Sequence, residues 1–343
     1  MATDHSSSDH ALPLVLTPGE PAGVGAEIAL KAWRDARSEL PPFFLMEDPE
    51  RLARLASDSG LGAKLCQIET PGEASAVFAN ALPVMPIRYP APVRAGHPDP
   101  TNGGAVIEAI RDAVSLVQAG QASAVVTNPI QKSALYQAGF THPGHTEYLA
   151  DLAGEGCVPV MMLATEALRV VPVTVHVPLD QVPGRLTLEA IVTAGRITAA
   201  ALVRDFAVPA PRLAIAGLNP HAGEGGSLGR QEIDIIAPAI EALRAEGVLC
   251  EGPAPADTLF HAEARSRHDA VICMYHDQAL IPLKTVDFWG GVNVTLGLPF
   301  VRTSPDHGTA LDLAGTGKAD ARSLMAALRL AAKMAARRQE AKL

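Results

Sequence analysis

The chain has 343 residues, of which 48% are apolar and 4% aromatic, and its formal net charge at pH 7 is -9. This length exceeds one ordinary hydrophobic core and predicts two domains or one large α/β unit. The acidic balance argues against nonspecific nucleic-acid binding, which needs a basic surface. An anionic substrate would therefore need a local concentration of arginine and lysine.

The four cysteines are widely spaced and form no C-x-x-C pair. This spacing favours buried free thiols over disulfides or a zinc knuckle, which is typical of the reducing cytoplasm. The sequence shows no signal peptide and no apolar run of about 18 residues, so we expect neither secretion nor a membrane span. Residues 1–11 are polar and serine-rich, and we predict that they form a mobile tail.

The first predicted elements are a strand, a glycine-rich turn and a helix. Leu12 to Leu16 form a short apolar run, the turn TPGEPAGVGAE follows, and a helix is expected from about Gly25. This order is typical of the start of an α/β unit. The glycine spacing G-x3-G-x-G matches neither the dinucleotide fingerprint nor a Walker loop. By spacing alone it is a weak motif.

A second helix is predicted from a cap at Asn102 to Gly120, followed by a strand at 124–126. The residues Thr-Asn-Pro that come next predict another helix, over about 127–139. Free amides at its start, together with Lys132, would suit a phosphate or a carboxylate. A plain helix cap beside a solvated lysine explains the same residues equally well.

The rest of the chain continues to alternate strands and helices. Residues 170–177 alternate in a way that predicts a strand, with valines on one face and Thr174 and His176 on the other. Basic residues near the C-terminus, Arg337, Arg338 and Lys342, complement the dipole of the last helix. The remaining predicted elements are a helix over 188–206, a strand over 212–218, a helix over 231–246, a strand over 270–274 and a helix from about 323.

Three histidines lie at or just past the carboxyl ends of predicted strands: His176, His221 and His276. If these strands are parallel, right-handed crossovers bring their ends to one edge of the sheet, where open α/β sheets bind ligands. Three neutral imidazoles with an open coordination position form a Lewis-acid site for Zn²⁺ or a similar divalent ion. The alternative is that each histidine is a hydrogen-bonded loop residue.

Long blocks of the chain resemble the 4-hydroxythreonine-4-phosphate dehydrogenase family, the NAD-dependent enzymes of vitamin B6 synthesis. The blocks run from residue 17 to residue 317, so the resemblance covers nearly the whole chain. They are TPGEPAGVGAEIALKAW, TNPIQKSALYQAGF, PGHTEYLA, GLNPHAGEGGSLG, ADTLFH, MYHDQALIPLK and VNVTLGLPFVRTSPDHGTALDLAGTG.

The resemblance implies a two-domain α/β fold similar to isocitrate and isopropylmalate dehydrogenases, with the active site in the interdomain cleft. It implies a terminal, NAD-binding domain formed by 12–135 plus 295–343, and a central domain for metal and dimerisation formed by 136–294. It also implies an obligate homodimer with the metal site near the subunit interface.

The resemblance assigns roles to individual residues. The metal ligands are the three histidines named above. Lys284 binds the substrate or relays a proton, and Asp257 is a candidate either for supporting a metal ligand or for handling a proton. The other implied substrate contacts are His145, Thr146, Asn293 and Arg302. The block DHGTALDLAG resembles an adenine-side NAD loop, which implies cofactor contacts at His307, Gly308, Thr309 and Asp312. Thr316 lies between Gly315 and Gly317. Many relatives have a lysine at the position between these two glycines.

The implied reaction is oxidation of 4-phosphooxy-L-threonine at C3 with decarboxylation to 3-amino-2-oxopropyl phosphate, CO₂ and NADH. Zn²⁺, Mg²⁺, Co²⁺ and Mn²⁺ all remain open as the ion, and so do NAD and NADP as the cofactor. One alternative is a paralogue that oxidises 4-phospho-D-threonate or erythronate, or a cis-dihydrodiol dicarboxylate. Another is a non-catalytic metal- or nucleotide-binding protein of the same fold.

Overall fold

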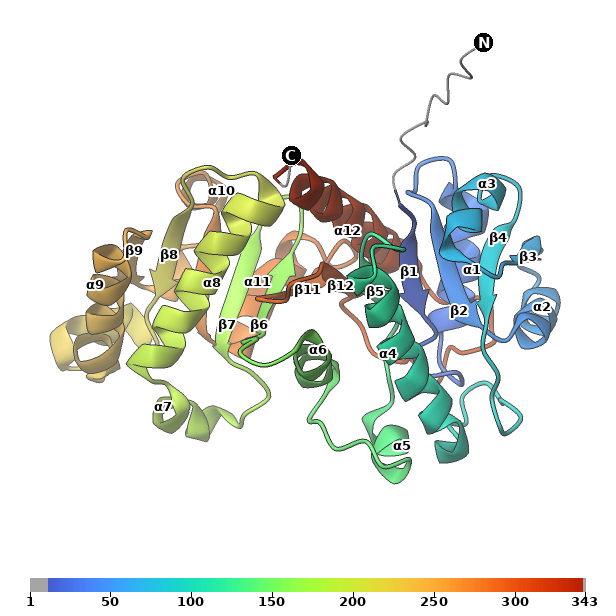
Figure 1. Ribbon diagram of the computed structural model, residues 1–343. Helices are drawn as coiled ribbons and strands as arrows, with labels where there is room; N and C mark the ends of the chain where they lie inside the picture. The colour runs from blue at the N-terminus through green and yellow to red at the C-terminus, as the bar shows by residue number, and fades with distance from the viewer. Residues whose placement is uncertain (1–11, 342–343) are drawn as a thin grey trace, which may run out of the picture. The chain divides into compact units, whose positions relative to one another are not determined.

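The computed structural model describes residues 12–341, and its helices and strands are labelled in Figure 1. The predicted tail at 1–11 and the predicted dipole partner Lys342 lie outside the described residues. Within the described residues, no single helix is long and apolar enough to cross a membrane. One bent pair, Leu179–Arg185 with Leu188–Phe206, passes a test of length and composition. All four cysteines are free thiols, as expected, but only Cys250 and Cys273 are buried.

The described chain forms two compact units, each of mixed α/β structure, so the predicted α/β class is confirmed. Unit 1 consists of residues 12–141 together with Gly308–Ala321. Unit 2 consists of His142–His307 together with residues 322–341. The domain bounds expected from the sequence differ from these and stay a prediction.

Unit 1 contains a parallel sheet in the strand order β3-β4-β2-β1-β5. Its strands are β1 (Leu14–Thr17), β2 (Phe43–Glu47), β3 (Leu65–Gln67), β4 (Leu82–Pro86) and β5 (Val125–Thr127). Its helices are α1 (Gly25–Ala36), α2 (Pro49–Asp58), α3 (Ala74–Val77), α4 (Gly103–Gln118) and α5 (Lys132–Gln137), with short 3-10 turns η1 (Pro71–Glu73) and η2 (Pro100–Asn102).

Apolar strands and capped helices stabilise the fold of unit 1. The strand β1 is buried along its whole length, as parallel strands covered on both faces usually are. Phe43 packs edge-on against Phe78 with ring centres 5.1 Å apart, and the Trp33 indole donates to the Phe78 carbonyl. The helix α2 starts with Pro49 after Asp48, whose side chain accepts a hydrogen bond from the Arg51 amide.

Two predicted helix starts in unit 1 are wrong in detail. The Asn102 side chain does not cap α4, because its Oδ1 accepts from the Ala91 amide instead. The helix after β5 starts at Lys132 and not beside Pro129, since the Asn128 amide group donates to the Thr17 carbonyl and ties β5 to β1. The resulting helix has 6 residues, so it offers only a weak dipole to an anion.

Unit 2 contains a mixed sheet in the order β12-β11-β6-β7-β10-β8-β9. Pairing is antiparallel from β12 to β7 and parallel from β7 to β9. Its strands are β6 (Val160–Ala164), β7 (Arg169–Thr174), β8 (Arg212–Ala216), β9 (Leu249–Ala254), β10 (Ala270–Tyr275), β11 (Val292–Leu296) and β12 (Arg302–Pro305).

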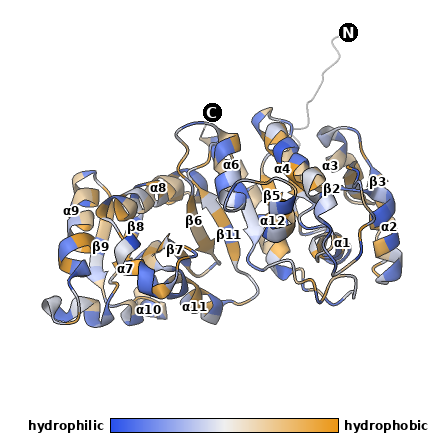
Figure 2. Ribbon diagram, turned by 90° about the horizontal axis from the view of Figure 1, so that it is seen from below, coloured by the Kyte–Doolittle hydropathy of each residue, from blue (hydrophilic) through white to orange (hydrophobic). Residues whose placement is uncertain are grey.

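Helices cover both faces of the unit 2 sheet (Figure 1). The helix α11 packs on one face through Ala279 and Leu283, and α8 and α12 pack on the other. In Figure 2 the outer helices carry both hydrophilic and hydrophobic stretches. The helices are α6 (His145–Ala153), α7 (Val182–Arg185), α8 (Leu188–Phe206), α9 (Ala237–Ala245), α10 (Ala262–Arg265), α11 (His276–Val286) and α12 (Arg322–Glu340), with single turns η3 (Leu179–Gln181), η4 (Pro220–Gly226), η5 (Glu232–Ile236) and η6 (Ala256–Thr258).

The alternating strand predicted over 170–177 is shorter in the structure. The strand β7 ends at Thr174 and is mostly buried, because strands pair with both of its edges and helices cover both faces. Its neighbours are β6 and β10. The strand end therefore falls before His176, which lies in the segment that follows.

Candidate functional site

The strands that lead to the three histidines are neighbours and parallel, as the sequence argument required. The strand β10 lies between β7 and β8 and pairs with both in parallel, so the three carboxyl ends share one edge of the sheet. His276 directly follows β10 and begins α11. His176 and His221 lie in the segments that follow β7 and β8.

Two of these imidazoles are neighbours. The ring centres of His176 and His276 are 5.6 Å apart. Two imidazoles on one tetrahedral ion, with nitrogen–metal bonds of about 2.0 Å, place their ring centres roughly 5 Å apart. The Nδ1 atom of His276 lies 2.7 Å from the Asp277 carboxylate, which favours the tautomer that leaves Nε2 available to a metal. The pair therefore fits two positions around a divalent ion.

The third predicted ligand does not complete a set with this pair. Across residues 12–341, no three histidine, cysteine, aspartate or glutamate side chains are arranged so that they could hold a metal ion. His221 as a ligand therefore stays a prediction. Its backbone, like that of His176, is left-handed, with φ of 53° and 56° respectively. Such conformations in residues other than glycine are uncommon and concentrate at functional sites.

A polar face on β11 and β12 carries two of the predicted substrate contacts. Asn293 is directly opposite Ser304 in the antiparallel ladder, so their side chains point to the same side. Strand alternation puts Thr295 and Arg302 on that side as well. The Arg302 guanidinium donates to the Thr295 hydroxyl at 2.9 Å. Burial lowers the pKa of Arg302 to about 10, so the group remains charged at neutral pH.

Lys284 lies beside the end of β12. Its Nζ atom is 2.6 Å from the Asp306 carboxylate, 3.0 Å from the Asp306 carbonyl and 5.2 Å from the centre of the Phe288 ring. The Asp306 amide in turn donates to the Ser323 hydroxyl. The sequence analysis gave Asp306 no role. The signal that could have found it is its place at the start of the block that contains the predicted cofactor contacts.

The other predicted site residues of unit 2 occupy short helices. His145 and Thr146 form the first turn of α6, where each is half-buried. Asp257 is exposed in η6. His307 is half-buried and is the last residue of unit 2 before the chain enters the predicted cofactor loop. The roles of all four residues stay predictions.

The predicted cofactor loop, Gly308–Ala321, is attached to α1 through one buried carboxylate. Glu27 is fully buried and accepts from the Gly315 amide at 2.9 Å and from the Ala319 amide at 3.1 Å. The Thr309 carbonyl accepts from the Val24 amide at 3.0 Å. Sequence reasoning missed Glu27, although a carboxylate on an apolar helix face in the first turn was a usable signal.

The glycine-rich turn before α1 allows this close approach of two backbones. A Cβ atom at Gly23 would lie 2.9 Å from the Thr309 carbonyl oxygen, closer than real side chains come. Thr309 also pairs through its hydroxyl with the Gln131 side chain at 3.3 Å. The glycine-rich turn does not match a nucleotide-binding motif by its spacing. The lack of a side chain at Gly23 instead lets the loop that contains Gly308, Thr309 and Asp312 pack closely against it.

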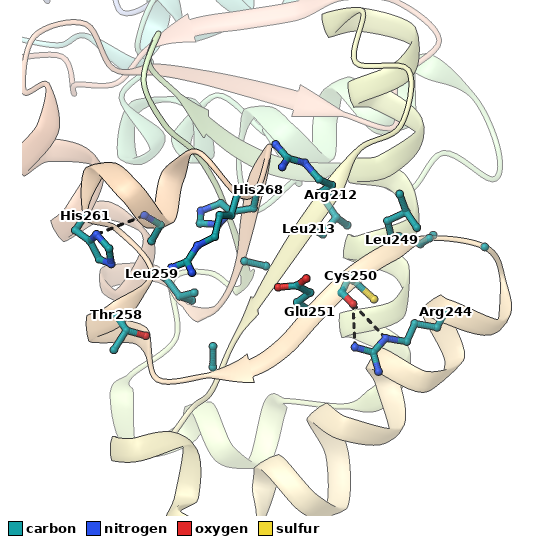
Figure 3. Close-up of a pocket in the computed structure, with 16 residues that line it drawn as sticks. Arg212, Leu213, Arg244, Leu249, Cys250, Glu251, Thr258, Leu259, His261 and His268 are labelled. Carbon is teal, nitrogen blue, oxygen red and sulfur yellow. Dashed lines mark hydrogen bonds between the residues drawn. The ribbon is translucent and has the colours of Figure 1, made fainter.

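A separate cavity of about 780 Å³ opens near the other ends of the parallel strands (Figure 3). Arg212 and His268 line it where β8 and β10 begin. The Arg212 side chain is paired with Asp269, and two nitrogens of Arg244 donate to the Cys250 carbonyl. The sequence assigned no role to these residues, and they lie away from the strand-end histidines.

Comparisons with solved structures give the class of protein. A structure of 4-hydroxythreonine-4-phosphate dehydrogenase from Klebsiella pneumoniae is 40% identical to this chain, with a TM-score of 0.86. The match covers 95% of this chain and 100% of that structure's chain. A terephthalate 1,2-cis-dihydrodiol dehydrogenase from Burkholderia xenovorans LB400 is 28% identical over 94% of this chain and 98% of its own, with a TM-score of 0.63. The chain is thus an enzyme of the dehydrogenase class, as predicted.

The family follows from the sequence comparisons. The family model described as pyridoxal phosphate biosynthetic protein PdxA matches residues 39–331. A curated 4-hydroxythreonine-4-phosphate dehydrogenase from Caulobacter vibrioides is 56% identical over 331 residues, which cover 95% of this chain and 98% of the relative. The chain belongs to the PdxA family of pyridoxal phosphate biosynthetic proteins. The resemblance inferred from the sequence blocks is confirmed.

Proposed function

We propose that this protein oxidises 4-phosphooxy-L-threonine at C3, with NAD or NADP as hydride acceptor. The oxidised β-keto acid then loses CO₂ and yields 3-amino-2-oxopropyl phosphate for pyridoxal 5'-phosphate synthesis. The observation that carries this proposal is the 56% identity, over 95% of the chain, to a relative named 4-hydroxythreonine-4-phosphate dehydrogenase. The cytoplasm, where the cofactor is available and thiols stay reduced, is the proposed compartment.

The substrate has a phosphate and a carboxylate, and the proposed contacts have matching chemistry. Arg302 is only 3% exposed, and a charged guanidinium at such a position favours an anion that offsets its lost hydration. Its planar fork can donate two parallel hydrogen bonds to a carboxylate or phosphate. Asn293 shares its face of the sheet and adds an amide. His145 and Thr146 are the remaining proposed substrate contacts.

The divalent ion, proposed to be held by His176, His221 and His276, supplies Lewis-acid chemistry that favours loss of the hydroxyl proton and stabilises negative charge during decarboxylation. The Asp277 carboxylate fixes the ring of His276 at Nδ1. We further propose a homodimer with this site near the subunit interface.

Proton handling is assigned to Lys284 and Asp257. Lys284 either binds the substrate or moves a proton at Nζ, and the neighbouring Asp306 carboxylate holds that atom in place. The cofactor is proposed to bind His307, Gly308, Thr309 and Asp312. The nicotinamide performs the redox step, so the contribution of these residues is to orient it.

A second candidate is a paralogue activity on 4-phospho-D-threonate or erythronate, or on a cis-dihydrodiol dicarboxylate. The likeness to a terephthalate 1,2-cis-dihydrodiol dehydrogenase favours it, but at 28% identity this likeness is weaker. The test is the rate of NAD or NADP reduction by the purified protein with each substrate. We expect the highest kcat/KM with 4-phosphooxy-L-threonine, and a higher value with any other substrate would overturn the proposal.

A further inference from the structure

The segment that contains His221 has an unusual backbone. Five consecutive residues, from His221 to Gly225, are left-handed, with φ between 42° and 76°. Three of them are not glycine, and for such residues this conformation is sterically unfavourable. A strained turn of this kind persists only where its surroundings determine it, and such strain concentrates at functional sites.

A buried carboxylate holds the start of this segment. Glu232, which is 3% exposed, accepts from the Leu218 amide at 2.8 Å and from the Asn219 amide at 2.7 Å through Oε1. Its Oε2 atom accepts from the Asn219 side chain at 2.9 Å. The same Oε2 would lie 2.6 Å from a Cβ atom at Gly223, so the left-handed turn wraps directly over the carboxylate.

A neighbouring amide side chain links this segment to the other two histidines. Gln278, which is 8% exposed, accepts from the Met274 amide at 2.7 Å and donates to the Gly217 carbonyl at 2.8 Å. The Thr174 hydroxyl donates to the Met274 carbonyl at 2.8 Å. Buried hydrogen bonds thus connect the ends of β7, β10 and β8, directly before the residues that the proposed metal site uses.

We propose that Glu232 is a positioning residue, which fixes the left-handed segment and so sets the place from which the imidazole of His221 would reach a metal ion at the strand ends. This inference rests on the proposed function. Glu232 acts through the backbone of residues 218 and 219 and does not touch the substrate. A carboxylate is suited to this role because one group can accept all three hydrogen bonds, whereas a glutamine amide has one acceptor oxygen.

The experiment measures Co²⁺ affinity by equilibrium dialysis, without NAD or substrate, and the visible absorption of the bound ion. Glu232→Gln is compared with Glu241→Gln, which makes the same change at an exposed residue of α9. We expect Glu232→Gln to bind Co²⁺ about 10–100-fold more weakly and with an altered spectrum, whereas Glu241→Gln stays like the unmodified protein. The substrate KM should be retained, and kcat should recover as Co²⁺ is raised.

Circular dichroism and thermal unfolding show whether each variant is folded. If Glu232→Gln is unfolded, Glu232→Asp takes its place, since it keeps the charge but is too short to reach all three donors. Loss of the fold in both variants, or unchanged Co²⁺ affinity in a folded one, would overturn the positioning role. His221→Ala separates this result from the proposed function: unchanged Co²⁺ affinity there would show that the metal assignment itself is wrong.

Discussion

The two ends of the parallel strands in unit 2 are both polar, and both have a histidine next to β10. At the carboxyl ends, the rings of His176 and His276 lie 5.6 Å apart and the adjoining backbone is left-handed. At the amino ends, His268 lines a cavity where the charges are paired in ordinary ways, such as Arg212 with Asp269 (Figure 3). Polar composition alone therefore does not distinguish the two ends.

The two ends differ in how many distant segments meet there and in how strained their backbone is. Parallel pairing brings segments that are distant in the sequence to one edge, and the left-handed turns are stabilised by buried side chains such as Glu232. At the amino ends, Arg212 is paired with Asp269, and Arg244 donates to the Cys250 carbonyl. We propose that the carboxyl ends are the functional edge of the sheet, because side chains meet there over a strained backbone.

The largest expected effect on kcat/KM comes from replacing a histidine at one end of β10, compared with the same replacement at the other end. His276→Ala should lower kcat/KM for the proposed substrate by about 1000-fold or more and reduce bound metal, because it removes a proposed ligand. His268→Ala, at the other end of the strand, should change kcat/KM by no more than about threefold. Steady-state kinetics and elemental analysis of the purified variants measure both effects. Equal losses in the two variants would remove the distinction between the ends.

The next effect concerns the polar face on β11 and β12. Arg302→Ala should raise the KM for the substrate by about 100-fold and leave cofactor affinity almost unchanged, because it removes charge-assisted hydrogen bonds to an anion. Titration of the substrate at fixed NAD, and of NAD by fluorescence, separates these quantities. Arg302→Lys keeps the charge and should recover only part of the loss. A matching loss of NAD affinity would show that Arg302 has another role.

A change away from both strand ends should affect stability alone. Burial acts to raise the pKa of Asp205, but hydrogen bonds and charge from Arg204 and Arg338 outweigh it, so the pKa lies below its usual value. A lowered carboxylate pKa stabilises the fold above the unfolded pKa of about 3.9, and this contribution disappears as pH falls through the folded pKa.

Asp205→Asn should therefore lower the free energy of unfolding by about 2 kcal/mol at pH 7. The difference from the unmodified protein should shrink steadily below about pH 4. Urea unfolding at several pH values measures it, with kcat/KM at pH 7 as the control. If the difference in the free energy of unfolding stayed constant down to pH 2, the ionisation of Asp205 would not be the cause of the lost stability.

The smallest predicted effect is in unit 1. Glu27→Gln keeps the shape of the side chain but removes one acceptor from the hydrogen bonds to Gly315 and Ala319. It should raise the KM for NAD by about tenfold, since the predicted cofactor loop loses its attachment to α1. The KM for the substrate should stay within about twofold. A shift in the substrate KM alone would contradict the assignment of this loop to the cofactor.

The positions of the strand-end histidines could be predicted because alternating strands and helices favour parallel strands, and the carboxyl ends of parallel strands share an edge. The register that puts Asn293 and Arg302 on one face could not be predicted, since it depends on β11 and β12 being antiparallel neighbours. Glu27 and Glu232 were missed for a related reason. Each accepts hydrogen bonds from backbone amides that are distant in the sequence or lie in irregular segments. A sequence pattern does not show which amides approach the carboxylate.

The same limit explains the errors in local structure. Asn128 before a proline is a typical helix start, yet here its side chain bonds to Thr17 on a neighbouring strand. Arg338 was assigned to the dipole of the last helix, but it also forms an ion pair with Asp205 on α8. Tertiary contacts of this kind override local preferences, so the elements were predicted better than their ends.

The most direct test is NADH formation from 4-phosphooxy-L-threonine by protein stripped of metal with a chelator and then resupplied with Zn²⁺, Co²⁺, Mg²⁺ or Mn²⁺. We expect turnover to vanish on stripping, to return with at least one of these ions, and not to return in His276→Ala. Full turnover by the stripped protein, with no metal detectable, would contradict the proposal that the strand-end imidazoles hold the ion on which the reaction depends.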